Sequence, residues 1–173
     1  MEKLLSSIKS HIYYEVGISP DTLLVSSLGW TTMTFGDDYQ KYTELYHHLQ
    51  KNQIRNVTPI YATIGLKPSL DHFILTNPLG SSTCDTVTIG VVKLNRGCDQ
   101  LTIINGLQLS LSRHLVECLV INIYPKNKPT NIWIELILSI TQHGYTVYEL
   151  DLDLPFDLAK IHQIEETTLY FRK

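Results

Sequence analysis

Two segments of this chain place an acid and a glycine directly after a strand-like run. In the first, Glu15-Val16-Gly17 precedes a helix start at Ser19-Pro20-Asp21. A glycine at this point lets the backbone approach a bound cofactor, and the first turn of the following helix offers unpaired N–H groups. A plain chain turn uses the same glycine. The segment therefore fits either a cofactor-binding turn or an ordinary one.

The second segment is Phe35-Gly36-Asp37-Asp38, which follows a threonine-rich run. Folds that bind nucleosides place a carboxylate here, where it accepts hydrogen bonds from ribose hydroxyls. Asp37 or Asp38 could reach a ribose, although the residue directly after the run is Gly36. Both aspartates could instead cap the helix predicted over residues 39–52.

A third segment, Asn105-Gly106-Leu107-Gln108, places two amides beside a glycine. Amides can hydrogen-bond a ligand, but they cannot act as a base or hold a metal strongly. No carboxylate occurs between Asp99 and Glu117. This part of the chain therefore offers binding groups without acid–base chemistry.

The elements that would position these segments alternate between strand and helix. Strands are predicted over residues 11–16, 31–35 and 57–64, with helices over residues 20–28 and 39–52 between them. The second helix carries apolar side chains at spacings of three and four. Strand, helix, strand, helix, strand at these loop lengths predicts a parallel α/β sheet.

The middle of the chain departs from this order. Residues 68–82 and 85–94 predict an antiparallel hairpin excursion at the edge of the sheet. Residues 101–104 then form a short apolar strand, residues 107–114 a short helix, and residues 118–124 a strand buried on both faces. A helix over residues 130–143 precedes the last two strands, residues 145–150 and 167–171, which pair and supply an antiparallel C-terminal edge strand.

Composition favours a single globular domain over residues 1–173. The chain is 43% hydrophobic and 18% charged, with a net charge of −3, and its basic residues are dense only within residues 125–129. Direct nucleic-acid binding, which normally uses a basic stripe, is therefore not expected. No apolar run is long enough to span a bilayer, the N-terminus lacks a signal-peptide pattern, and Cys84, Cys98 and Cys118 have no metal-ligand spacing. We expect an intracellular, cytoplasmic protein without a metal site.

The order of these motifs resembles the FkbM-type family of S-adenosylmethionine-dependent O-methyltransferases over nearly the whole chain. The family's opening acid-Val-Gly-Ala-Asn-x-Gly sequence is similar to residues 15–21, and its Phe-Glu-Pro is similar to residues 35–37. Residues 49–57 resemble its Asn-x-x-x-Asn-Val step, and residues 101–108 fall on its Lys-Ile-Asp-Val-Glu-Gly-Phe-Glu. Residues 120–125 fall on its Ile-Glu-x-x-Pro strand and residues 143–148 on its late Gly-Tyr strand. The resemblance implies a Rossmann-like methyltransferase fold.

The departures from the family pattern share one direction, because acids are replaced. Glu15 keeps its carboxylate, whereas the resemblance places a neutral residue at six positions where the family carries an acid: Gly36, Asn95, Ile103, Asn105, Gln108 and Asn122. These replacements remove groups that would hold a cofactor and order an acceptor. The histidines lie where packed or solvent-facing side chains are expected, so no catalytic residue is predicted.

Two functions follow from this resemblance. The first is a catalytically inactive methyltransferase-like domain, a pseudoenzyme without cofactor, that acts as a binding or structural subunit with protein partners, possibly within a larger assembly. Its contacts could include Tyr39, Tyr42, Tyr46 and Trp30, since tyrosine and tryptophan are enriched at interfaces, although core packing would also account for them. The alternative is an active methyltransferase that holds S-adenosylmethionine with Glu15, Gly17, Asp37 and Asn105.

Overall fold

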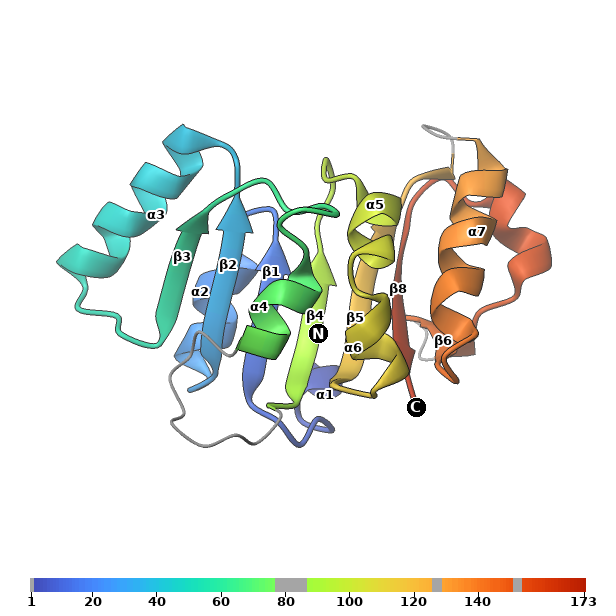
Figure 1. Cartoon of the computed structure of the whole chain (residues 1–173), viewed down its shortest axis with the longest axis horizontal. Helices are drawn as coiled ribbons and strands as arrows, with labels where there is room; N and C mark the ends of the chain where they lie inside the picture. Colours follow the sequence, from blue (N-terminus) through green and yellow to red (C-terminus); the bar gives the residue numbers. More distant parts are fainter. Residues whose placement is uncertain (1, 77–86, 126–128, 151–153) are drawn as a thin grey trace.

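The computed structural model describes residues 2–76, 87–125, 129–150 and 154–173. Its centre is one sheet in the order β3-β2-β1-β4-β5-β8-β6-β7 (Figure 1). The first five of these strands are parallel: β3 (Val57–Tyr61), β2 (Thr31–Gly36), β1 (Ile12–Val16), β4 (Ile89–Leu94) and β5 (Val116–Ile123). The strand order reverses between β1 and β4, which makes this the switch point of the sheet.

The last three strands complete the sheet with antiparallel pairs. β8 (Thr167–Arg172) pairs with both β5 and β6 (Thr146–Glu149), and β7 (Leu154–Pro155) pairs with β6. The prediction that the last two strands pair is confirmed, and β8 is antiparallel as expected. β8 is nevertheless not the edge strand. It lies between β5 and β6, and β7 forms the edge beyond β6.

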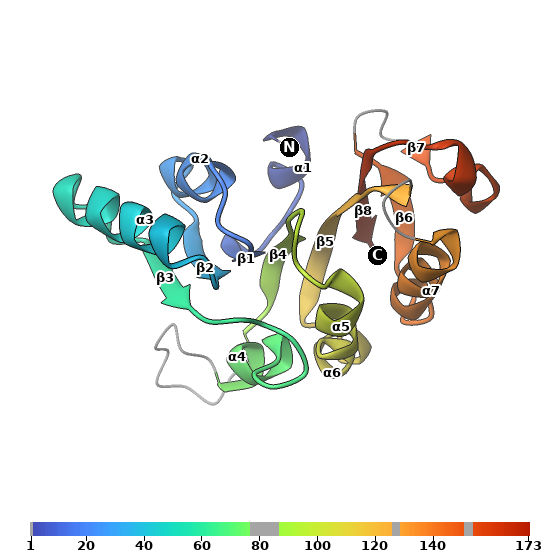
Figure 2. The same cartoon turned by 90° about the horizontal axis from the view of Figure 1, so that it is seen from above.

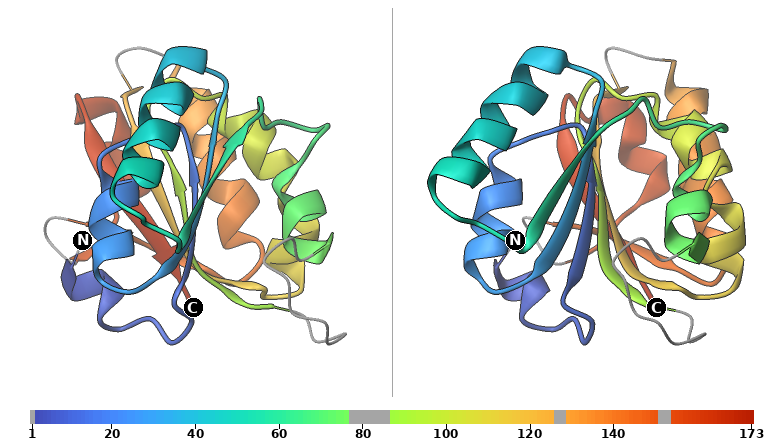
Figure 3. Two further views of the ribbon diagram at one scale, coloured as in Figure 1. Left: turned by 90° about the vertical axis from the view of Figure 1, so that its left-hand side faces the viewer. Right: turned by 60° about the vertical axis from the view of Figure 1, so that its left-hand side comes forward.

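Helices cover both faces of the sheet (Figures 2 and 3). One face carries α1 (Glu2–Leu5), α2 (Asp21–Ser27) and α3 (Tyr39–Lys51), while the other carries α4 (Leu70–Thr76), α5 (Gln100–Asn105), α6 (Gln108–Ser112) and α7 (Thr130–Thr141). A 3₁₀ helix, η2 (Leu158–Gln163), precedes β8. The largest hydrophobic cluster includes side chains of α4 to α7 and the central strands. The predicted α/β architecture with a mostly parallel sheet is confirmed.

The antiparallel hairpin predicted in the middle of the chain is wrong, although a strand does form within residues 85–94. Residues 70–76 form α4. Residues 89–94 form β4, a central strand that pairs in parallel with β1 on one side and β5 on the other. The antiparallel hairpin excursion therefore does not exist over these residues. The alternation of residues 85–94 suggested a half-exposed edge, but all six residues of β4 are buried because strands flank it and helices cover both faces. Residues 77–86, which belong to the same prediction, lie outside the described residues.

The predicted strand over residues 101–104 is also wrong, because this segment lies within α5. Asp99 caps that helix, since its carboxylate accepts hydrogen bonds from the backbone N–H and the hydroxyl of Thr102. The cap offsets the strand preference of the β-branched run Thr102-Ile103-Ile104. Within the described part of the chain, no helix is long and apolar enough to cross a membrane.

Candidate functional site

A cleft of about 440 Å³ lies at the carboxyl ends of the first four parallel strands. Its walls come from the segments after β1, β2, β3 and β4, namely residues 16–18, 35–38, 62–64 and 95–99, together with Lys41. Ligands of open α/β sheets bind in this position, beside the switch point, and the volume falls within the range of small-molecule sites.

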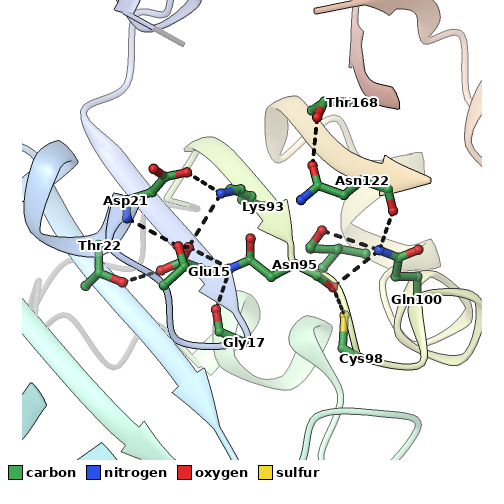
Figure 4. A network of polar contacts seen from close by, with 12 residues as sticks. Glu15, Gly17, Asp21, Thr22, Lys93, Asn95, Cys98, Gln100, Asn122 and Thr168 are labelled. Atoms are coloured by element: carbon green, nitrogen blue, oxygen red, sulfur yellow. Dashed lines mark hydrogen bonds and ion pairs between the residues drawn. The ribbon is translucent and has the colours of Figure 1, made fainter. Parts of the chain in front are cut away.

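Glu15 lies under this cleft and is fully buried. Its carboxylate accepts hydrogen bonds from the hydroxyls of Ser19, at 2.5 Å, and Thr22, and from the side-chain amide of Asn95, at 2.7 Å (Figure 4). Burial raises the pKa of Glu15, while these hydrogen bonds and the nearby Lys93 charge act in the opposite direction. The carboxylate is therefore satisfied by side chains of its own chain.

Lys93, the next to last residue of β4, supplies a positive charge to this network (Figure 4). Its ammonium lies 3.9 Å from a Glu15 carboxylate oxygen and forms a closer ion pair with Asp21, in the first turn of α2. Only 8% of the Lys93 side chain is exposed. Because an unpaired buried ammonium is costly, the two carboxylates and Lys93 depend on one another.

Asn95 joins the two strands of the switch point. Its amide donates to Glu15 and also to the carbonyl of Gly17, while its backbone N–H donates to the carbonyl of Val16 at 3.0 Å. The contact is close enough that a Cβ on Gly17 would lie 3.0 Å from the Asn95 Cβ. Asn95 therefore links the ends of β1 and β4 through hydrogen bonds and is itself a lining residue of the cleft.

The end of β2 is also filled by a side chain of the β1 loop. Ile18 packs against Gly36, so that a Cβ at this glycine would lie 2.8 Å from the Ile18 Cδ1. Asp37 follows on the exposed surface and accepts a hydrogen bond from the Thr63 hydroxyl at 3.3 Å. Asp38 instead caps α3 by accepting from the backbone N–H of Lys41 at 3.1 Å.

A second set of amides joins the ends of β4 and β5. Gln100 is buried at the start of α5, and its amide donates to the backbone carbonyls of Asn95, at 3.3 Å, and Asn122, at 2.9 Å (Figure 4). The Asn122 side-chain oxygen accepts a hydrogen bond from the Thr168 hydroxyl of β8 at 2.9 Å. These amides stabilise the junctions between strands.

The structure brings together three of the four residues predicted for cofactor binding. Gly17 and Asp37 line the cleft, and Glu15 lies directly beneath it. Asn105 is exposed at the C-terminal end of α5 and is not among the lining residues. The reason is that residues 101–104 are helical, which carries Asn105 away from the carboxyl edge of the sheet.

Residues 95–99 form one wall of the cleft. The resemblance singled out Asn95 in this segment, as a position where the family carries an acid, but not the rest of the wall. A signal for it exists, because the apolar β4 ends in Lys93-Leu94 and is followed by Asn95 and then Gly97. A polar residue and a glycine after a buried strand repeat the pattern of Glu15 and Gly17. Trp30, considered above as a contact residue, is only 4% exposed and packs with its ring centroid 5.1 Å from that of His11.

The cleft has the volume of a small-molecule site, and its lining carries the cations Lys41 and Arg96 as well as three aspartates. S-adenosylmethionine presents ribose hydroxyls, an ammonium, a carboxylate and a sulfonium. Asp37 is an accessible acceptor for hydroxyls, whereas the Glu15 carboxylate and the Asn95 amide are already engaged with each other. No group of three His, Cys, Asp or Glu side chains suited to a metal occurs in the part of the chain that the structure describes.

No protein-family model matches the chain, and no curated protein matches it. Solved structures do. A candidate methyltransferase from Streptococcus mutans, solved in complex with S-adenosylhomocysteine (SAH), is similar with a TM-score of 0.63 and 17% identity, covering 99% of this chain and 94% of that one. An rRNA methylase from Streptococcus thermophilus is similar with a TM-score of 0.62 and 17% identity, over 99% and 92% of the two chains.

The methyltransferase FkbM from Methylobacillus flagellatus is similar with a TM-score of 0.63 and 15% identity. The match covers 94% of this chain but 43% of FkbM, so this chain corresponds to less than half of that protein. At these identities the likeness concerns the fold. The chain has the Rossmann-like fold of methyltransferases.

Proposed function

We propose that this chain is a methyltransferase-like domain that does not transfer methyl groups and acts as a binding or structural subunit with protein partners. The observation that carries this proposal is the hydrogen bond that the Asn95 side-chain amide donates to the Glu15 carboxylate across the switch point. Both groups lie where a cofactor would need free polar partners, and both are buried. Binding S-adenosylmethionine there would require the network to open.

The groups available for chemistry support the same proposal. Methyl transfer requires a methyl carbon held in line with the acceptor atom, and an alcohol acceptor also requires a base. Among the carboxylates that line the cleft, Asp38 and Asp99 cap helices α3 and α5. Asp37 is the remaining carboxylate, and no histidine lines the cleft within the described residues.

One observation favours the alternative, an active methyltransferase with a diverged pocket. The cleft keeps its place and its size, and Asp37 is exposed at the end of β2, where a ribose hydroxyl could reach it. In that case Asp37 and Gly17 would contact the cofactor, while Glu15 would support the loop from below.

Calorimetric titration with S-adenosylmethionine and with SAH separates the two functions. The proposal predicts no heat of binding at ligand concentrations of about 1 mM, which corresponds to a free energy of binding weaker than about −4 kcal/mol. Micromolar binding that weakens about tenfold in Asp37→Ala, but not in the matched surface variant Asp157→Ala, would contradict the proposal and support the enzyme.

A further inference from the structure

The proposed function requires a surface for a partner, and the structure has an unusual cluster of tyrosines at the β3 edge of the sheet. Tyr39, Tyr42 and Tyr46 lie on α3, and Tyr61 ends β3. Tyr39 is 66% exposed, Tyr46 43% and Tyr61 53%. We call these four residues the tyrosine cluster.

The rings of the tyrosine cluster contact one another instead of entering the core. The Tyr61 ring centroid lies 5.6 Å from those of both Tyr39 and Tyr42, and the Tyr42 and Tyr46 rings are stacked at 6.2 Å. The same helix buries Leu45 and Leu49 against β3. Core packing by α3 is therefore accomplished by the leucines, which leaves the tyrosines available on the surface.

A partner is not expected to extend the sheet at this edge. β3 is the terminal strand of the sheet. Towards β2, the carbonyl of Asn56 accepts a hydrogen bond from the Thr32 N–H, and the N–H of Ala62 donates to the Gly36 carbonyl. Residues alternate along a strand, so Pro59 faces outward, and it has no N–H to donate. Proline in this position opposes the addition of another strand.

Charge disfavours a nucleic acid at this surface. Asp37 and Asp38 directly precede Tyr39, and the ammonium of Lys41 is held 3.9 Å from the Asp38 carboxylate. This end of the tyrosine cluster therefore has an excess of negative charge, which repels phosphates and attracts a basic partner.

The dimensions of the tyrosine cluster suit a polyproline II segment. Tyr46 follows Tyr39 by seven positions along the helix, a rise of about 10 Å, and one turn of polyproline II spans about 9 Å. Such segments dock on exposed aromatic rings. Their backbone carbonyls make no internal hydrogen bonds, so they can accept hydrogen bonds from tyrosine hydroxyls.

We propose that the tyrosine cluster binds a proline-rich peptide segment whose basic end lies at Asp37. This inference rests on the proposed function, because it gives the binding subunit its class of partner. The acidic end sets the orientation of the peptide, and the stacked rings of Tyr42 and Tyr46 receive the prolines.

The test is the fluorescence anisotropy of a labelled decaproline peptide with two arginines at one end. Saturable binding with a dissociation constant on the order of 100 µM is expected, and Tyr39→Ala/Tyr46→Ala should weaken it at least about tenfold. Leu138→Ala, on the exposed face of α7, is the matched control and should bind like the wild type. Unchanged thermal unfolding of the double variant would exclude loss of fold as the cause.

Equal binding of a glycine-serine peptide with the same arginines would overturn the inference, since charge alone would then explain it. Tighter binding of an oligouridine, or no saturable binding of the proline peptide at about 1 mM, would also overturn it. Titration of SAH in the same preparations separates the two proposals. SAH binding contradicts the proposed function, whereas a wild-type protein that binds neither the proline peptide nor SAH contradicts this inference alone.

Discussion

Glu15 and Asn95 are buried beside the cleft and joined by a hydrogen bond. A buried carboxylate has a high cost unless hydrogen bonds and an opposite charge satisfy it. Here Ser19, Thr22 and Asn95 donate to Glu15, and Lys93 supplies the charge. This arrangement stabilises the loop after β1 without any ligand.

Asn95→Ala tests the structural weight of this network. The change removes the donor to the Glu15 carboxylate and to the Gly17 carbonyl, so we expect the free energy of unfolding to fall by about 1–3 kcal/mol. Urea denaturation measures this change in the free energy of unfolding. Asn105→Ala is the matched control, because Asn105 is exposed, and its loss should stay within about 0.5 kcal/mol. Equal losses in the two variants would show that Asn95 has no special role.

The raised pKa of Glu15 predicts a dependence of stability on pH. Burial raises this pKa above its ordinary value of 4.5 despite the hydrogen bonds and Lys93. A carboxyl group of this kind contributes stability that is complete below the unfolded-state pKa and is lost as pH rises through the folded-state pKa. The free energy of unfolding should therefore fall with rising pH above 4.5 in the wild type, relative to Glu15→Gln. Denaturation curves at several pH values check this, and parallel profiles for the two proteins would refute it.

At the scale of the elements, β4 holds the site together because it lies between β1 and β5. Gly90 permits this packing, since a Cβ there would lie 1.9 Å from the Ser10 carbonyl oxygen and 2.9 Å from the Ile8 Cγ2. No side chain can occupy that position without a shift of the backbone.

Gly90→Ala should therefore destabilise the fold by about 3 kcal/mol or more. Gly97→Ala is the control, because its Cβ would meet nothing within 4 Å and only its φ of +95° causes strain, at a cost of about 1–2 kcal/mol. Thermal and urea unfolding of both variants compare the two costs. A smaller loss for Gly90→Ala than for Gly97→Ala would contradict the packing described here.

The elements around the first two strands could be predicted from sequence because their signals are local. Asp38 caps α3 and leucines repeat along that helix, and the acid–glycine pattern located Glu15, Gly17 and Asp37. β4 could not be placed in this way, since its burial depends on neighbours distant in sequence. The Asn95 hydrogen bonds require the pairing of β1 with β4, which no local pattern specifies.

At the scale of the whole molecule, the chain has the sheet of the methyltransferase-like fold, and hydrogen bonds of its own side chains link β1 and β4 at the switch point. Two regions bear on the proposed function: the cleft at the carboxyl ends of the strands and the tyrosine cluster at the β3 edge. We propose that binding takes place at the outer surface and that the cleft holds no cofactor.

The most direct test of this claim is an NMR titration of ¹⁵N-labelled protein with SAH, followed at the backbone amides of Gly17, Gly36 and Gly97. All three glycines line the cleft, so a bound ligand must change their surroundings. The account predicts that their resonances do not move at about 1 mM SAH. Saturable shifts of these three amides with a micromolar dissociation constant would contradict it.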